Sequence, residues 1–227
     1  MKALIPETLN EITLGQMQRY HKLTDGLEDH DEVRRYLLDV FCGIDRSKYD
    51  SLNAQQLLDI SQQVQVVLNI EPEHQMIFSM NDNDYGFIPN LDDITMGEFV
   101  DLESIGDDIK DWHKIMAILY RPITGTFGKR YNIDPYDGYD SASQYKQMPL
   151  GVALGALLFF WNLGKDLLVY TLKSLKEVQK DMQVNTILQR SGVGLGQYTD
   201  LLKEILDALT KSRPSVCIPA YIGSVMK

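Results

Sequence analysis

The sequence predicts a mainly helical fold of the α+β type, in which a helical domain carries a small β-hairpin or sheet element and an internal duplication. Three observations predict this fold. Apolar residues recur at helical spacing in several segments, one stretch has the signature of a β-hairpin, and a motif near the amino terminus returns 82 residues later. With 227 residues, 44% hydrophobic and 24% charged, the chain has the composition of a globular protein, and we expect residues 1–227 to form a single domain.

The duplication is the most specific pattern in the sequence. The stretch LNEITLGQM at residues 9–17 is closely similar to LDDITMGEF at residues 91–99, and the offset of 82 continues without a gap into the next helical pattern. It relates Leu9 to Leu91, Ile12 to Ile94, Thr13 to Thr95, Gly15 to Gly97, Val33 to Ile115, Leu37 to Leu119 and Gly43 to Gly125. We therefore predict duplicated strand-helix-helix units at about residues 9–44 and 91–126.

Each unit is expected to begin with a strand or extended segment, because Leu-x-x-Ile-Thr is β-prone. Thr13 and Thr95 then stand where they can cap the following helix, with Gln16 and Glu98 three residues later as the return half of a capping box. A second helix follows in each unit. Gly43 should end the second helix of the first unit, and Pro122 should end that of the second.

The remaining elements follow from local patterns. Residues 74–90 predict a β-hairpin with Asn-Asp-Asn-Asp at its turn, and residues 51–69 predict an amphipathic helix. A central apolar helix is expected over about residues 149–183, with Pro149 in its first turn. The stretch SGVGLG at 191–196 should break it, and residues 197–211 should form the last helix.

The central helix is apolar enough to raise the question of a membrane. Residues 150–164 carry no charge, but Lys165 and Asp166 interrupt the run before the ~20 residues that a bilayer requires. We interpret it as a buried core helix in which Gly151 and Gly155 let another helix approach closely. The amino terminus lacks the continuous apolar run of a signal peptide, so no export is indicated.

The charge balance excludes some partners. Acidic residues outnumber Lys and Arg by 32 to 22, which gives a net charge of −10. Duplex nucleic acid and anionic membranes both bind proteins through basic side chains. We therefore expect no sequence-specific nucleic-acid binding and no membrane partner.

No catalytic motif is present. The histidines stand alone, without a second ligand at metal-binding spacing: His21, His30, His74 and His113. GTFGKR at 125–130 lacks the spacing and the Ser or Thr of a phosphate loop, and the acid clusters at 25–32, 81–84 and 105–111 lack the spacing of a calcium-binding EF-hand. We expect no catalytic residue, no metal site and no cofactor. Cys42 falls in an apolar helical pattern and is expected to be a buried free thiol.

The carboxy-terminal tail, residues 213–227, is predicted to be extended because it contains two prolines. It is also apolar, which is unusual for a free end. We take it as a candidate contact with a partner subunit through Val216, Ile218, Tyr221, Ile222 and Val225. The alternative is that the tail folds back on its own core.

Parts of the chain resemble a group of viral proteins. IPNLDDITMGEFVDLES, WHKIMAILYRPITG, YDGY and MPLGVALGALLFFWNLGKDLL, within about residues 87–170, are similar to proteins encoded in the structural-gene region of tailed bacteriophages, including crAss-like phages. The resemblance implies a role in virion assembly, as a neck or tail component or as a helper during tail construction. It supplies no catalytic residues, and the amino-terminal unit and the Gly-rich carboxy-terminal segment lie outside it.

The leading hypothesis is a non-enzymatic protein of a tailed-phage virion, made in the host cytoplasm, which forms an oligomer in the neck or tail and contacts other phage structural proteins. The alternative is a tail-assembly chaperone that is absent from the mature particle. A third hypothesis is an enzyme, such as a hydrolase that uses the acid clusters.

Overall fold

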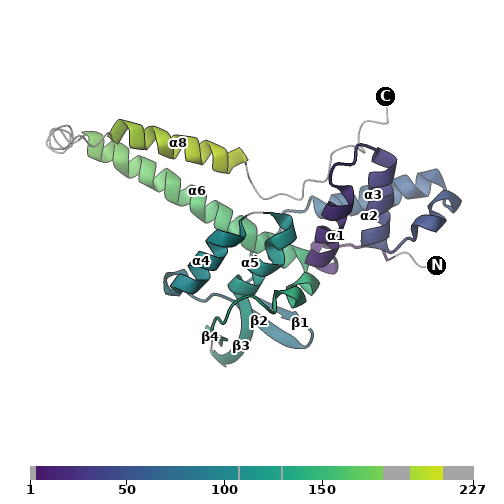
Figure 1. The fold of residues 1–227 in the computed structure, drawn as a ribbon, viewed down its shortest axis with the longest axis horizontal. Coiled ribbons are helices and arrows are strands. Elements are labelled where there is room, and N and C mark those ends of the chain that lie inside the picture. Colours follow the sequence, from purple (N-terminus) through teal and green to yellow (C-terminus); the bar gives the residue numbers. More distant parts are fainter. Residues whose placement is uncertain (1–3, 107, 129, 181–194, 212–227) are drawn as a thin grey trace. The chain divides into compact units, whose positions relative to one another are not determined.

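The computed structural model describes residues 4–106, 108–128, 130–180 and 195–211. These residues are mostly helical and include a small four-stranded antiparallel sheet, which confirms the predicted fold class at that level (Figure 1). They group into two compact units, one that includes the chain up to Gly155 and one that begins at Ala156. We describe each unit by itself. The single-domain organisation of residues 1–227 stays a prediction.

The first unit begins with three helices whose ends follow from local sequence. Helix α1 (Leu14–Thr24) has the predicted capping box between Thr13 and Gln16. Helix α2 (His30–Cys42) is capped by Asp29 and ends, as predicted, at Gly43, which adopts the left-handed conformation at φ 63°. After a 3-10 turn, η2 (Arg46–Ser51), helix α3 (Ala54–Leu68) occupies the predicted third position.

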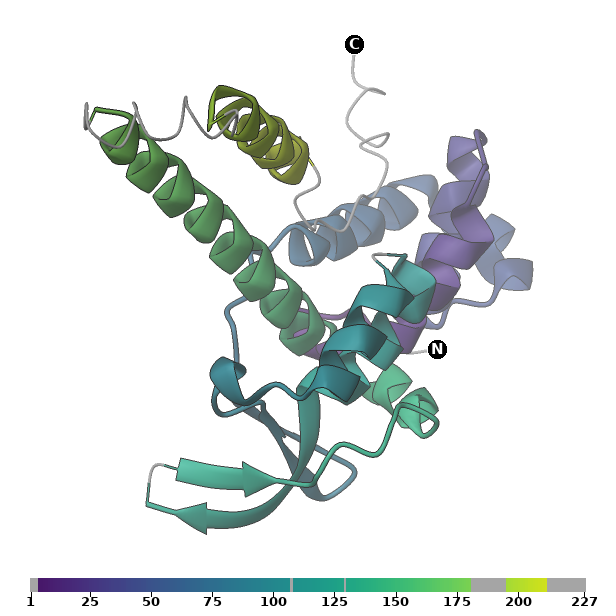
Figure 2. The same cartoon turned by 60° about the vertical axis from the view of Figure 1, so that its left-hand side comes forward.

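The sheet consists of two hairpins placed side by side in the order β1-β2-β3-β4. The predicted hairpin is confirmed as β1 (Ile77–Met80) and β2 (Asn83–Phe87). Its turn contains only Asn81 and Asp82, both at positive φ (53° and 61°), which is the type I′ geometry that matches the twist of a hairpin. The second hairpin, β3 (Tyr120–Phe127) and β4 (Arg130–Ile133), was not predicted from the sequence (Figure 2).

Between the hairpins lie η3 (Leu91–Asp93), α4 (Met96–Ile105), η4 (Ile109–Asp111) and α5 (Trp112–Leu119). The prediction that Pro122 ends the second helix of this unit is wrong. Helix α5 ends three residues earlier, because Tyr120 already pairs with Phe87 as the first residue of β3. The predicted apolar face of α5 is buried.

An aromatic cluster joins the sheet to the segment that precedes α6. Tyr120 is fully buried and makes edge-on contacts with Phe78 and Phe87, with ring centroids 5.2 Å apart in both cases. Tyr145, in η5 (Ala142–Gln147), donates a hydrogen bond of 2.5 Å to the Tyr120 carbonyl oxygen. Burial raises the pKa of both tyrosines, so both hydroxyls stay protonated as donors near neutral pH.

Helix α6 (Leu150–Lys180) is the predicted central helix, and Pro149 directly precedes it. Its first residues, Leu150 to Ala156, are buried, but most of the helix beyond Leu158 is partly or fully exposed, so the prediction of a buried core helix holds only for its start. The predicted close approach at Gly151 and Gly155 is made by chain outside any α-helix. A Cβ at Gly151 would meet Asn10 of η1 (Leu9–Glu11), and one at Gly155 would meet the Glu73 backbone.

By length and composition, residues 150–177 of α6 could cross a membrane, with a mean hydropathy of 1.5 in the most apolar window. One third of that window, 33%, is buried inside the protein. The core helix of a soluble protein passes the same test, so this helix is weak evidence for a membrane span.

The second unit contains the rest of α6 and helix α8 (Leu195–Lys211), which confirms the predicted last helix. Leu172 of α6 and Leu202 of α8 are buried. Helix α8 begins inside the predicted break at 191–196, and the first residues of that stretch lie outside the described part of the chain. Each helix of this unit also exposes large apolar side chains, namely Leu167, Val169 and Tyr170 in α6 and Leu201 and Ile205 in α8.

The structure does not show a duplication as a whole, although single features recur at the offset of 82 residues. Both Thr13 and Thr95 form capping boxes, and both follow a 3-10 turn, η1 and η3. The strands predicted at the start of both units are wrong, because Leu9–Glu11 and Leu91–Asp93 form 3-10 turns. The alternative of an extended segment holds for Ile12 and Thr13, which are extended, and Thr13 forms an isolated bridge with Pro149. The two segments also end differently, since α2 stops at Gly43 whereas α5 continues directly into β3.

Cys42 carries a free, buried thiol, as predicted, and burial raises its pKa to about 11. The unfolded chain releases this proton at lower pH than the folded chain. The thiol therefore contributes stability that is complete below about pH 9 and is lost as the pH rises toward 11.

We expect the free energy of unfolding in urea to fall between about pH 9 and 10.5, and to fall less steeply in Cys42→Ala. An unchanged slope in that variant would contradict this origin.

Candidate functional site: the outer face of helix α4

Helix α4 is attached to the rest of the first unit through a charged side chain. The Oε2 atom of Glu98 accepts hydrogen bonds from the Thr95 backbone nitrogen at 2.6 Å and from the Thr95 hydroxyl at 2.8 Å. Its other oxygen, Oε1, lies 2.7 Å from the guanidinium of Arg121 on β3. Glu98 is the one residue of α4 that is buried, at 2% exposure. The inner side of this helix therefore contains a buried charge, next to the half-buried side chains of Leu102 and Ile105.

The Glu98–Arg121 ion pair belongs to a larger set of polar contacts. The Arg121 side chain is 13% exposed, and its guanidinium lies 5.9 Å from the ring centroid of Tyr136. The Tyr136 hydroxyl in turn donates a hydrogen bond of 2.5 Å to Asp101, one turn after Glu98 on α4. Burial, together with this hydrogen bond, raises the pKa of Tyr136. These contacts fix both the position and the rotation of α4 about its own axis.

The outer face of α4 is apolar. Met96, Phe99 and Val100 recur at i, i+3 and i+4, and their exposed fractions are 76%, 56% and 51%. An amphipathic helix on the surface of a globular protein normally turns such a stripe toward the core and its charged residues toward water. Helix α4 instead buries the charged Glu98 and leaves these three apolar side chains exposed. We call Met96, Phe99 and Val100 the α4 face.

The corresponding residues of α1 are covered. At the offset of 82, Met96 corresponds to Leu14, which is fully buried, and Phe99 corresponds to Met17, which is 2% exposed. The chain around Pro149 lies against the start of α1, where Pro149 forms an isolated antiparallel bridge with Thr13. The same sequence pattern is therefore used as core in α1 and displayed in α4.

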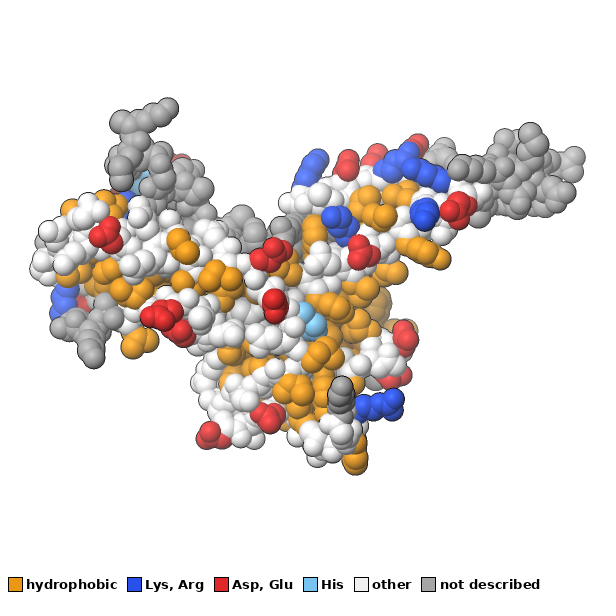
Figure 3. Space-filling model, turned by 180° about the vertical axis from the view of Figure 1, so that it is seen from behind, with side chains coloured by type: hydrophobic (Ala, Val, Ile, Leu, Met, Phe, Trp, Pro, Cys, Tyr) orange, Lys and Arg blue, Asp and Glu red, His pale blue; other side chains and the backbone are white. Residues whose placement is uncertain are grey.

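Other apolar side chains are exposed at the sheet. Met76 and Ile77, at the edge strand β1, are 43% and 45% exposed, and Phe127 at the end of β3 is 69% exposed. Figure 3 shows hydrophobic side chains gathered over the region of the sheet, in the lower centre of the view. Unlike the α4 face, these residues do not form a single helical stripe.

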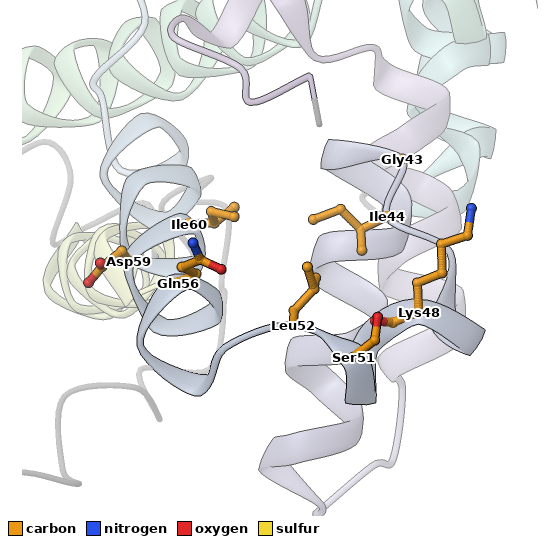
Figure 4. A pocket seen from close by; sticks show the side chains of 8 residues that line it. All are labelled: Gly43, Ile44, Lys48, Ser51, Leu52, Gln56, Asp59 and Ile60. Carbon is orange, nitrogen blue, oxygen red and sulfur yellow. The ribbon is translucent and has the colours of Figure 1, made fainter. Parts of the chain in front are cut away.

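A cleft of about 480 Å³ lies between the end of α2, η2 and α3. Figure 4 shows Ile44, Leu52 and Ile60 directed toward its interior, with Gln56 and Asp59 on the α3 side. Its size falls within the range of small-molecule sites. Such sites also place several polar groups so that they converge on the ligand, whereas the residues directed inward here are aliphatic, so this cleft does not indicate a reaction.

A second cleft, of about 430 Å³, lies beside Arg121 and is lined by Asp134, Tyr136, Ser141, Tyr145 and other residues. Three of its polar side chains are already engaged. Arg121 pairs with Glu98, and the hydroxyls of Tyr136 and Tyr145 donate to Asp101 and to the Tyr120 carbonyl oxygen. These interactions stabilise the fold, and they leave no pair of these groups arranged as nucleophile and base.

The described residues contain no group of three or more His, Cys, Asp or Glu side chains that could hold a metal ion. His113 is buried on α5, and its Nδ1 lies 3.1 Å from the side-chain nitrogen of Gln18. Burial lowers the pKa of His113 and of His74. Two of the acid clusters supply helix caps instead, at Asp29 for α2 and Asp108 for η4.

The predicted contact residues Val216, Ile218, Tyr221, Ile222 and Val225 lie outside the described residues. The α4 face was missed by sequence reasoning, because Met96, Phe99 and Val100 have the spacing of a core-facing stripe. A signal in the sequence was the polar residue at the third position of each helix, Gln16 and Glu98.

No family model, curated protein or solved structure matches the chain.

Proposed function

We propose that this chain is a non-enzymatic virion protein of a tailed bacteriophage, a subunit of an oligomeric assembly in the neck or tail. It would be made in the host cytoplasm and would contact copies of itself and other phage structural proteins. The resemblance of residues 87–170 to proteins from phage structural-gene regions supports the viral setting. The α4 face supports a role in protein contacts.

The single observation that carries the proposal is the exposed apolar stripe of α4. A helix that buries a glutamate and displays Met96, Phe99 and Val100 loses hydrophobic stabilisation in a free monomer. Exposed apolar stripes of this kind mark surfaces that another protein covers. The Glu98–Arg121 pair holds the stripe outward, so the surface is ready to bind before a partner arrives.

The repeat also belongs to this proposal. Units 9–44 and 91–126 would derive from one duplicated element, in which the first copy became part of the core and the second a contact surface. The two capping boxes and the two 3-10 turns at the same offset support this origin. The different exposure of Leu14 and Met96 gives the two copies different roles.

A tail-assembly chaperone is the second candidate. An apolar stripe on a short, well-anchored helix could hold an apolar segment of an unfinished tail protein and release it on assembly. Such a protein would show the same α4 face but would be missing from the finished particle. We propose no catalytic activity, no cofactor, no nucleic-acid recognition and no membrane partner in either case.

Quantitative mass spectrometry of purified particles of the encoding phage tests the proposal, with the portal protein as an internal standard. A fixed copy number relative to the portal is the expected result. Abundance in infected cells combined with absence from the particle would overturn the structural role and favour the chaperone. A control with mock-infected host proteins defines the level of contamination.

A further inference from the structure

The start of α1 shows how this chain binds an extended, proline-containing segment. Residues 148–150 run antiparallel to residues 12–14, with Pro149 opposite Thr13. Two backbone hydrogen bonds of 2.8 Å close this contact, from the Leu14 nitrogen to the Met148 carbonyl and from the Leu150 nitrogen to the Ile12 carbonyl. Gly15 allows the close approach, since a Cβ there would lie 2.8 Å from the Lys146 carbonyl oxygen.

The start of α4 has the same local geometry without a covering segment. Thr95 forms the same capping box as Thr13, but Met96 is 76% exposed where Leu14 is buried. A Cβ at Gly97 would have only the Thr95 hydroxyl within 4 Å, at 3.9 Å. Among the described residues, the Met96 nitrogen has no backbone acceptor corresponding to Met148. The docking position used on α1 is therefore open on α4.

The chain contains a second segment with the pattern that fills this position on α1. Met148-Pro149-Leu150 is matched by Ile218-Pro219-Ala220, in each case a large apolar residue, a proline and a smaller or equal apolar residue. The charges are complementary as well. Residues 212–227 contain Arg213 and Lys227 and no acidic residue, whereas Asp92, Asp93 and Glu103 are exposed at and beside α4.

We infer that the α4 face binds the carboxy-terminal segment of a second copy of this chain, with Pro219 opposite Thr95. The Met96 nitrogen then donates to the Ile218 carbonyl, and the Ala220 nitrogen donates to the Ile94 carbonyl. Ile218 and Val216, which precedes it and runs toward Phe99 in this register, cover Met96, Phe99 and Val100. This inference rests on the proposed role as a self-assembling subunit. The contact is heterologous, so repeating it from copy to copy closes a ring or extends a chain of subunits.

Disulfide trapping tests the contact with a cysteine that the chain already has. In the antiparallel register, Met96 lies opposite Ile218, the neighbour of Cys217, and a substitution there keeps Gly97, the equivalent of Gly15, in place. Met96→Cys in the full chain is expected to give a ladder of disulfide-linked multimers under mild oxidation, seen on non-reducing gels and removed by reductant. Cys42 is 3% exposed and should not take part.

Two controls define the result. Met96→Cys combined with Cys217→Ser should give no ladder, and Ser104→Cys, exposed at the far end of α4, should give much less than Met96→Cys. A disulfide confined to monomers would show that the segment binds its own chain and would overturn the contact between copies. The absence of any linkage between Cys217 and the cysteine introduced at position 96 would overturn the docking site itself.

Sedimentation of Met96→Asp provides a second readout without cysteine chemistry. Met96 is largely exposed, so this variant should fold as the parent does, with an unchanged circular dichroism spectrum. We expect a loss of roughly tenfold or more in the self-association constant, because a charge replaces an apolar contact at the centre of the interface. Unchanged association would contradict the inference. Neither experiment uses phage particles, so these outcomes are separate from the mass-spectrometric test of the proposed function.

Discussion

Replacement of Arg121 by Met should lower the free energy of unfolding by about 3–5 kcal/mol, because it leaves the Glu98 carboxylate buried without its counter-charge. The pair is 2.7 Å apart, with side-chain exposures of 13% for Arg121 and 2% for Glu98. The double variant Glu98→Gln with Arg121→Met should lose much less than the two single variants together, since no buried charge then remains. Urea unfolding followed by circular dichroism measures all three.

The chain offers a matched control for burial. Lys110 and Asp108 form an ion pair with the same separation of 2.7 Å, but their side chains are 71% and 46% exposed. Lys110→Met should change the free energy of unfolding much less than Arg121→Met does, because water screens a solvent-exposed pair. Equal effects of Arg121→Met and Lys110→Met would show that the Glu98–Arg121 pair is not the anchor of α4.

The anchoring of α4 also explains what the sequence could and could not predict. Caps and turns depend on residues within three or four positions, so the Thr13 and Thr95 capping boxes, the Gly43 stop and the Asn81-Asp82 turn follow from local chemistry. The orientation of α4 depends on Arg121, which is 23 residues away from Glu98 in the sequence. An apolar stripe at helical spacing indicates a helix, but it does not identify which side meets the core.

The β3–β4 hairpin was missed for a related reason. The stretch YRPITGTF contains a proline and a glycine, both of which are unfavourable in an isolated strand. In the folded chain, Pro122 pairs with Tyr85 and Arg121 with Gly86, so a neighbouring strand from another part of the sequence supplies the order. Gly86 leaves space for the Tyr131 ring, which would overlap a Cβ at that position. Such pairing is not visible in local propensity.

The sequence predicted less of the candidate site than of the fold. Sequence reasoning placed the partner contact in the tail at 213–227, and the structure adds a surface on α4 that the sequence did not single out. The α1 and α4 stripes are similar in sequence, but they have different surroundings in the fold. Leu14 is covered by chain that follows residue 145, whereas nothing within the described residues covers Met96 in the same way.

Gly155→Ala tests whether the start of α6 is fixed by close approach of the chain. A Cβ at this position would overlap the Glu73 carbonyl oxygen and lie 2.9 Å from its carbonyl carbon, and these are backbone atoms that cannot rotate away. In an exposed helix the same substitution would stabilise by roughly 1 kcal/mol. Here the overlap should outweigh that gain, and we expect a net loss of about 1–3 kcal/mol in urea unfolding.

Gly97→Ala is the matched helical control, because its Cβ would have only the Thr95 hydroxyl within 4 Å. At a concentration where the chain is monomeric, this variant should be more stable by roughly 0.5–1 kcal/mol. Opposite signs at the two glycines would show that Gly155 is needed for packing against residues 73–74, while Gly97 is conformationally dispensable in the monomer. If Gly155→Ala were stabilising as well, the contact between Glu73 and α6 would not contribute to the stability of the first unit.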